Sequence, residues 1–205
     1  MSTQPNSVLG WWFGGDTLPH GDDRAVAVGT THTVDGEIVP CKNGLHSSER
    51  PIDALRYARS GIVWRTRSSG TIVRGDDQIA ASERAYLARL DATAILRDFA
   101  RKCALDVIHL WDAPDVVRRF LETGDESLRD AARDAALAAL AAGAAAYAAY
   151  VAGAAGHAAR DARYAADAAR DARYAADAAD AARDKQNEWL TAAIEAAIRQ
   201  TGGPR

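Results

Sequence analysis

The sequence predicts an α+β protein, with a small strand-rich domain over residues 1–90 followed by an all-α, alanine-rich helical hairpin or bundle over residues 91–205. Two observations support this fold class. The first part is rich in Gly, Thr, Val, Asp and Trp, and its short β-prone runs are separated by turn signals. The second part carries apolar residues at helical spacing and becomes almost entirely alanine with charges between Asp125 and Gln200.

Short β-prone runs predict the strands of the first domain. The Asp35-Gly36 turn should join two of them as a hairpin, because Asp-Gly is a strong two-residue turn signal. A second hairpin should turn at Ser68-Ser69-Gly70. The predicted strands are Val8–Phe13, Thr30–Val34, Glu37–Pro40, Ile62–Thr66 and Thr71–Val73, with Ile79–Ala81 and Tyr86–Leu90 as edge strands.

One short helix is predicted between the two hairpins. Ser48 is a residue type that caps helix N-termini, and Pro51 fits the first turn because its missing N–H is not needed there. Ile52, Leu55 and Tyr57 follow and are expected to pack inward.

Two amphipathic helices are predicted over residues 91–124. The first ends near Trp111, and Asp112 with Pro114 starts the second with a cap and an early proline. Gly124 ends the second helix. The apolar stripe of the first helix consists of Ile95, Leu96, Phe99, Cys103, Val107 and Leu110.

The alanine-rich helices over residues 125–200 are capped by Asp125 and divide into two unequal halves. The first half is nearly uncharged after Asp134, so it must be covered. The second contains the ten-residue sequence Ala159–Ala168, repeated unchanged as Ala169–Ala178. The heptad-like seam of the first half consists of Leu137, Leu140, Ala144, Tyr147, Val151 and Ala154, and a normal apolar face resumes at Trp189, Leu190, Ile194 and Ile198.

Small side chains and paired charges in the second half favour close helix packing. Arg163 with Asp167, and Arg173 with Asp177, are four apart and add about 0.2–0.5 kcal/mol of helix support per pair. Alanine lets two backbones approach closely, although each methyl buries little area. The halves should therefore pack as an antiparallel hairpin that turns near Gly153, or against a second copy of the chain.

Bulk composition argues against several function classes. The formal net charge is −3, which gives no support for a nucleic-acid partner overall and leaves only a local basic patch open. Cys41 and Cys103 are too few for a disulfide framework and are expected to be reduced thiols. The segment Met1–Ser7 has no signal-peptide core, and the alanine run 131–155 is too weakly hydrophobic to span a membrane. A cytoplasmic protein is predicted.

Four residues of the first domain are candidate binding residues. Trp11 and Trp12 are adjacent on a strand, so they point to opposite faces of a sheet. They either pack between domains or offer a contact surface for a partner or a flat ligand. His46 follows a strand, and it either bonds a turn or acts with Tyr57 in a ligand site.

Three aromatic residues of the alanine-rich region, Tyr150, His157 and Tyr164, are seven apart and share one helix face. They either flank a shallow alanine seam or form a partner-binding stripe.

Neither a metal nor a cofactor is predicted. Cys41 and His46 could complete a tetrahedral zinc site only with Cys103 and His109. The latter two are six apart, about 240° around a helix, so their side chains do not converge. The glycines within Gly10–Gly15 lack the lysine and the following helix of a phosphate loop.

The segment Cys41–Ser48, followed by Pro51 and Tyr57, resembles an uncharacterised family of small phage and bacterial proteins. In that family a Cys, a Gly-Phe-His or Gly-Leu-His step and a proline-started helix ending in Tyr lie between short strands, and the likeness here covers roughly residues 8–90. The family has no established activity. The region from Phe99 into the alanine tract is similar to alanine-rich, immunity-type helical modules.

These features predict a non-enzymatic interaction protein that binds a protein partner, or itself, through the alanine-rich helices. The resemblances imply a setting in phage–host or inter-bacterial conflict. The alternative is an enzyme or nucleotide-binding protein, because the segment of His46 and Tyr57 is loosely similar to the NAD-contacting segment of ADP-ribosyltransferase folds. The Arg, Ser-Thr-Ser and Gln-x-Glu series of those enzymes is absent, so this alternative expects only a pocket near His46 and Tyr57.

Overall fold

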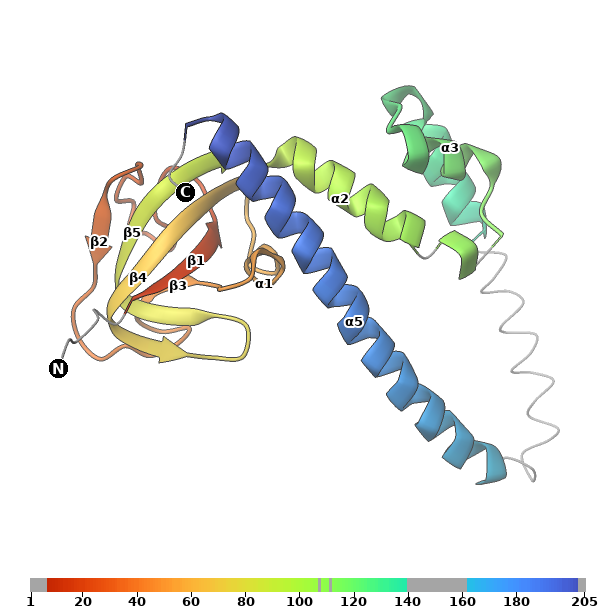
Figure 1. Ribbon diagram of the computed structural model, residues 1–205, viewed down its shortest axis with the longest axis horizontal. Helices are drawn as coiled ribbons and strands as arrows, with labels where there is room; N and C mark the ends of the chain where they lie inside the picture. The colour runs from red at the N-terminus through yellow and green to blue at the C-terminus, as the bar shows by residue number, and fades with distance from the viewer. Residues whose placement is uncertain (1–6, 107, 111, 140–161, 203–205) are drawn as a thin grey trace. The chain divides into compact units, whose positions relative to one another are not determined.

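The computed structural model describes residues 7–106, 108–110, 112–139 and 162–202 of the 205-residue chain (Figure 1). In its last helix, the side chains are described from Asp180 onward. The chain divides into two compact units. Unit 1 comprises Met1–Leu96 and Arg183–Arg205, and unit 2 comprises Arg97–Ala182.

Unit 1 is built on an antiparallel sheet in which the long strands β4 and β5 lie at the centre. The strand order is β1-β4-β5-β2, and β3 also pairs with β5. The α+β class is confirmed, because strands fill this part of the chain and helices follow. The strands are β1 Val8–Phe13, β2 Thr31–Thr33, β3 Leu45–Ser47, β4 Ile62–Arg74 and β5 Ile79–Asp91.

Successive side chains along each strand point to opposite faces of the sheet, and both faces of this sheet contain buried side chains. On one face Trp64 and Tyr86 pack with Leu18, Val26 and Leu45, which come from the loops and from β3. On the other face β1 and β4 contribute further buried side chains. These are Trp11, Phe13 and Val63.

The two predicted hairpins are wrong, although β1 is confirmed. Strand β2 pairs with β5, and beyond the Gly36 turn Val39 makes only an isolated bridge to Asn43. Strand β4 runs unbroken through Gly70. The two predicted edge strands, 79–81 and 86–90, are both parts of one central strand, β5. At Gly70 a Cβ atom would meet the Ser82 Oγ, and the register of the two strands shifts there. The glycine therefore marks a bulge instead of a turn.

Helix α1, Pro51–Leu55, confirms the predicted proline in the first turn. Ser48 is not its cap, because the N-cap residue is Arg50 and the backbone of Ser48 pairs with Trp11 of β1. Tyr57 lies outside the core, with 48% of its surface exposed.

The end of helix α5, Ala162–Gln200, completes unit 1. Leu190, Ile194 and Ile198 form one row at four-residue spacing and are buried, the first two fully. Figure 1 shows these C-terminal turns crossing the sheet of unit 1. The composition of the sequence placed residues 183–205 in the helical region, whereas their contacts place them in unit 1 with the strands.

The helices of unit 2 begin near the predicted residues, but α2 ends at Asp106, before the predicted end near Trp111. Gly124, with a φ of 66°, ends α3 as expected, and the Asp125 carboxylate accepts a hydrogen bond from the Ser127 N–H at 2.9 Å as a cap. Asp112 is not a cap, because Pro114 occupies the N-cap position of α3. The elements are α2 Thr93–Asp106, which starts in unit 1, then η1 Ile108–Leu110, α3 Asp115–Thr123, η2 Glu126–Leu128 and a helix over residues 129–139.

The predicted turn of the alanine-rich hairpin, and most of its seam, lie outside the described residues. Leu137 is described and is 58% exposed. The backbone of the decameric repeat is helical from Ala162 onward. Among the described helices, none is both long and apolar enough to cross a membrane.

Candidate functional site

The two adjacent tryptophans of β1 occupy different environments. Trp11 is 2% exposed, and the guanidinium of Arg65 lies 4.3 Å from the centre of its ring. Arg65 also feels the charge of Glu195 on α5, so Trp11 faces the side of the sheet that α5 covers. Trp12 packs against the opposite core, with its ring centroid 5.9 Å from that of Tyr86. The tryptophans therefore act as packing residues of unit 1.

A buried arginine lies beside Trp12. Arg84 of β5 is 2% exposed, and no carboxylate in the described part of the chain pairs with it. Its Nε and Nη2 donate to the Tyr86 hydroxyl at 3.1 and 2.7 Å, and its Nη1 donates to the backbone oxygen of His46. The guanidinium carbon lies 4.3 Å from the centre of the Trp12 ring. Burial lowers the pKa of Arg84.

The Tyr86 hydroxyl connects Arg84 to a histidine. Because the hydroxyl oxygen accepts from two nitrogens of Arg84, its own proton is directed to Nδ1 of His32, 3.1 Å away. Burial lowers the pKa of His32, and the charges of Arg24 and Arg84 lower it further. The geometry thus favours a neutral His32 that carries its proton on Nε2.

His46 of β3 bonds its own loop. Its Nε2 accepts a hydrogen bond from the Cys41 N–H at 3.1 Å, which requires an unprotonated nitrogen. Burial lowers the pKa of His46, and the charge of Arg84 acts in the same direction. Cys41 is exposed and has a φ of 63°, and its Sγ accepts from the Gln78 amide at 3.5 Å.

Tyr57 is paired on the surface, close enough to Cys41 that this residue acts electrostatically on its hydroxyl. Its hydroxyl donates to Oδ1 of Asp77 at 2.8 Å, and Arg56 pairs with the other oxygen at 2.7 Å. The hydrogen bond to Asp77 raises the pKa of Tyr57. No hydrogen bond of the described residues links Tyr57 to His46.

Unit 1 should lose stability as the pH falls below the ordinary histidine value of 6.5. The pKa values of His32 and His46 are both lowered in the fold, so the unfolded chain takes up protons first. Their contribution is complete above that pH and is lost as the pH falls toward the lowered values. Denaturant titrations followed by tryptophan fluorescence at several pH values measure this slope.

Two variants, His46→Gln and its control His109→Gln, test whether the histidines cause this change of stability with pH. Glutamine keeps an acceptor toward Cys41 but cannot titrate, so H46Q should flatten the pH dependence. His109 belongs to unit 2, and H109Q should leave the slope unchanged. If the free energy of unfolding of the wild type did not fall as the pH is lowered below 6.5, the lowered pKa values of His32 and His46 would be contradicted.

A polar cluster, called the latch here, fixes α5 to α1. Arg183 pairs with Asp53 at 2.7 Å, and Arg50 pairs with Asp184 at 2.7 Å. Asn187 accepts a hydrogen bond from the backbone N–H of Ile52 in the first turn of α1. Asp53 is 8% exposed, so its charge depends on these arginines. The members of the latch are Arg50, Asp53, Arg183, Asp184 and Asn187.

Replacing Asp53 by alanine should lower the free energy of unfolding of unit 1 by about 2 kcal/mol. The variant leaves Arg183 and Arg50 facing each other without the carboxylate between them. Glu49→Ala is the matched control, because Glu49 pairs with Arg74 at the surface and should contribute little. Equal effects of D53A and E49A in chemical denaturation would show that the latch does not stabilise the fold.

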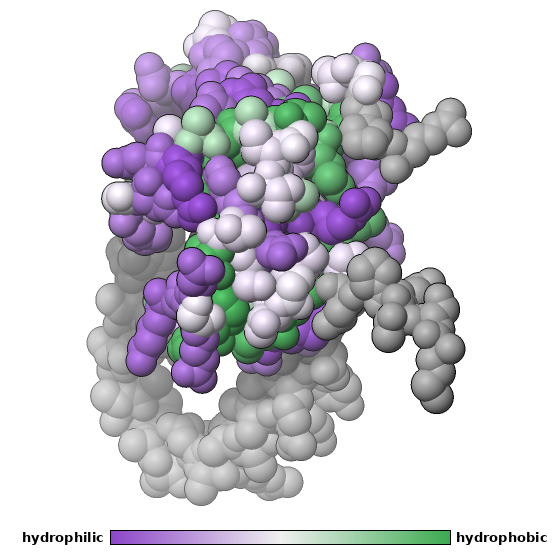
Figure 2. All heavy atoms as spheres, turned by 90° about the vertical axis from the view of Figure 1, so that its left-hand side faces the viewer, coloured by the Kyte–Doolittle hydropathy of each residue, from purple (hydrophilic) through white to green (hydrophobic). Residues whose placement is uncertain are grey.

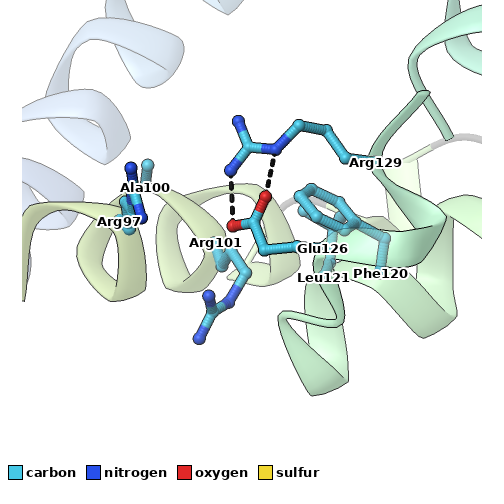
Figure 3. Close-up of a pocket in the computed structure, with 7 residues that line it drawn as sticks. All are labelled: Arg97, Ala100, Arg101, Phe120, Leu121, Glu126 and Arg129. Atoms are coloured by element: carbon cyan, nitrogen blue, oxygen red, sulfur yellow. Dashed lines mark hydrogen bonds and ion pairs between the residues drawn. The ribbon is translucent and has the colours of Figure 1, made fainter. Parts of the chain in front are cut away.

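Unit 2 contains a small cavity of about 220 Å³ between α2, α3 and the residues that follow (Figure 3). Glu126 and Arg129 face each other there in a two-bond ion pair. The hydrogen bonds from Arg129 lower the pKa of Glu126, and the charges of Arg97 and Arg101 lower it further. The lining residues are Arg97, Ala100, Arg101, Phe120, Leu121, Glu126 and Arg129.

The predicted stripe of Tyr150, His157 and Tyr164 lies outside the residues whose side chains are described. Cys103 lies in α2, and burial raises the pKa of its thiol. Across residues 7–106, 108–110, 112–139 and 180–202, no group of three or more His, Cys, Asp and Glu side chains could hold a metal ion.

Comparison with known proteins concerns unit 1. Residues 23–98 match the model of a domain of unknown function, DUF7666. The match confirms that this part of the chain is related to an uncharacterised family. The DUF7666 match leaves out β1 and the end of α5, which complete the sheet unit in this chain. No curated protein and no solved structure matches the chain significantly.

Proposed function

We propose that this chain is a non-enzymatic interaction protein that binds a second copy of itself through the alanine-rich part of α5. The observation that carries this proposal is a change of composition along one row of the helix. Followed from the C-terminal end of α5 backward, the row first holds large side chains that are buried in unit 1 and then two members of the latch. The positions that come before the latch in the sequence are one aspartate and otherwise alanine. The row reads Ile198, Ile194, Leu190, Asn187, Arg183, Asp180, Ala176, Ala172, Ala169 and Ala165.

A row of methyl groups needs a closely approaching backbone to bury useful area, and another alanine-rich helix provides one. The decamer Ala159–Ala168 carries two arginines and two aspartates, so two antiparallel copies would present complementary charges. The face of unit 1 in Figure 2 is largely polar, with hydrophobic atoms visible only between polar groups.

The resemblance to immunity-type modules supports a setting in phage–host or inter-bacterial conflict. The ADP-ribosyltransferase-like alternative gains no support from its two candidate residues. Nε2 of His46 is bonded to the Cys41 N–H, and the Tyr57 hydroxyl is bonded to Asp77. Neither group is positioned by these bonds toward a shared ligand.

Sedimentation velocity of the full chain tests the proposal. The wild type should dimerise at micromolar concentrations, and the double variant A169E/A176E should be monomeric because it places two charges in the alanine row. The matched control A178E/A181E adds the same charges on the opposite side of the helix and should still dimerise. Circular dichroism checks that all three stay helical. A monomeric wild type throughout the micromolar range would refute self-association.

A further inference from the structure

The cavity of unit 2 carries an excess of positive charge. Among the described residues, Arg129 pairs with Glu126 and Arg101 pairs with Asp98 at 2.5 Å. Arg97 makes no hydrogen bond or ion pair with any described residue, although its charge acts on Glu126. Three arginines and one carboxylate line the cavity, so its described lining carries an excess of positive charge, although the charge of Asp130 also acts on Arg129.

The walls of the cavity hold Arg129 in place. The Arg129 guanidinium lies 5.7 Å from the centre of the Phe120 ring, and Figure 3 shows both beside Glu126. An arginine stacked on a ring keeps its N–H groups in the plane of the guanidinium, where they can form two parallel bonds to an oxyanion. Leu121 and the methyl group of Ala100 supply the apolar part of the wall.

The neighbouring arginine is also held in place. At Gly124 a Cβ atom would come within 2.3 Å of Nη1 of Arg101, so a larger residue there would displace the end of that flexible side chain. The same glycine has a φ of 66° and ends α3. The lack of a side chain at Gly124 thus allows the helix to end there and leaves room for the Arg101 guanidinium.

We propose that this cavity binds a phosphoryl oxyanion, gripped by Arg97 and Arg129, with Glu126 as an internal competitor for Arg129. Its volume, about 220 Å³, is below the roughly 300–1,000 Å³ of pockets for drug-sized ligands, so it suits a single small group. Glu126 is held ionised by the arginines and occupies the donors that the oxyanion would use. The group can come from inorganic phosphate or from the terminal phosphate of a nucleotide.

Isothermal titration of the full chain with inorganic phosphate and, separately, with ADP tests this proposal. Arg97→Gln and Arg129→Gln should each weaken binding about tenfold, because each removes a charged donor. Glu126→Gln should instead tighten binding several-fold by removing the competitor. Arg119→Gln, on the exposed part of α3 outside the cavity, is the matched control and should not change the affinity.

The outcomes separate the sources and can refute the site. Tighter binding of ADP than of phosphate identifies a nucleotide, and equal affinities identify the phosphoryl group alone. Binding that is absent at millimolar concentration, or that is insensitive to R97Q and E126Q, would overturn the proposal. Equal affinity for chloride would also overturn it, because general charge attraction would then account for the binding. Phosphate binding is measured by titration and dimerisation by sedimentation, so the failure of one proposal can be told from the failure of the other.

Discussion

Replacing Leu190 by alanine should lower the free energy of unfolding of unit 1 by about 3 kcal/mol. Leu190 is fully buried in the row that α5 packs into unit 1. Truncation removes apolar contact and leaves a cavity that a helix fixed by the latch cannot close. Guanidinium unfolding monitored by tryptophan fluorescence measures the effect, because Trp11, Trp12 and Trp64 all belong to unit 1.

Glu188→Ala is the matched control for Leu190→Ala. Glu188 is exposed on the same turn of α5, so its removal should change stability by less than about 0.5 kcal/mol. Equal unfolding midpoints for L190A and the wild type would show that α5 does not belong to the core of unit 1. A chain shortened at Gly124 would lack the whole row, so it would test the fold of unit 1 before it tested self-association.

Replacing Arg84 by alanine should destabilise unit 1 by about 3 kcal/mol. The variant removes the donor to the His46 carbonyl and two donors to Tyr86, and it empties the space beside the Trp12 ring. Arg84→Met should cost less than Arg84→Ala, because both variants remove the buried charge but only methionine fills that space. Thermal and chemical unfolding of both variants measure the difference.

Arg67→Ala provides the control for the arginine series. Arg67 lies on β4 and is exposed, so its loss should change stability by less than about 0.5 kcal/mol. If R84A were as stable as R67A, the bonds of Arg84 to Tyr86 and His46 would contribute nothing to the fold. If R84M were less stable than R84A, filling the space beside the Trp12 ring would not be what the loss of Arg84 costs, and the packing part of the argument would be wrong.

Features that depend on local chemistry were predictable from the sequence. The apolar run Val8–Phe13 forms β1, Pro51 starts α1, Gly124 ends α3 and Asp125 caps the next turn. Each depends on the backbone preference of one residue or on a short pattern. The positions of these elements in the chain therefore follow without knowledge of the tertiary fold.

Strand pairing was not predictable in the same way. The chain bends at Gly36, which has a φ of 86°, yet β2 pairs with β5, which lies about fifty residues further on. Gly70 signals a turn by its residue type, whereas thirteen residues of β4 pair along β5 and the glycine absorbs a register shift. Such long-range pairing depends on the whole core, which local patterns do not contain.

The most constrained polar groups also escaped the sequence analysis. Arg84 lies between charged and small residues on β5, and a charged strand residue usually faces solvent. The only available signal was Tyr86 two residues later, on the same face of the strand. The latch had a visible trace in Arg183, Asp184 and Asn187, where the alanine repeat ends.

Unit 1 is assembled from segments that leave the ribosome far apart in time. Its strands are complete at Asp91, whereas the row of Leu190 and Ile194 is synthesised about a hundred residues later. At 5–20 residues per second this delay is on the order of ten seconds. During that interval the sheet lacks the helix that covers Trp11, so the nascent chain should need protection from aggregation until α5 emerges.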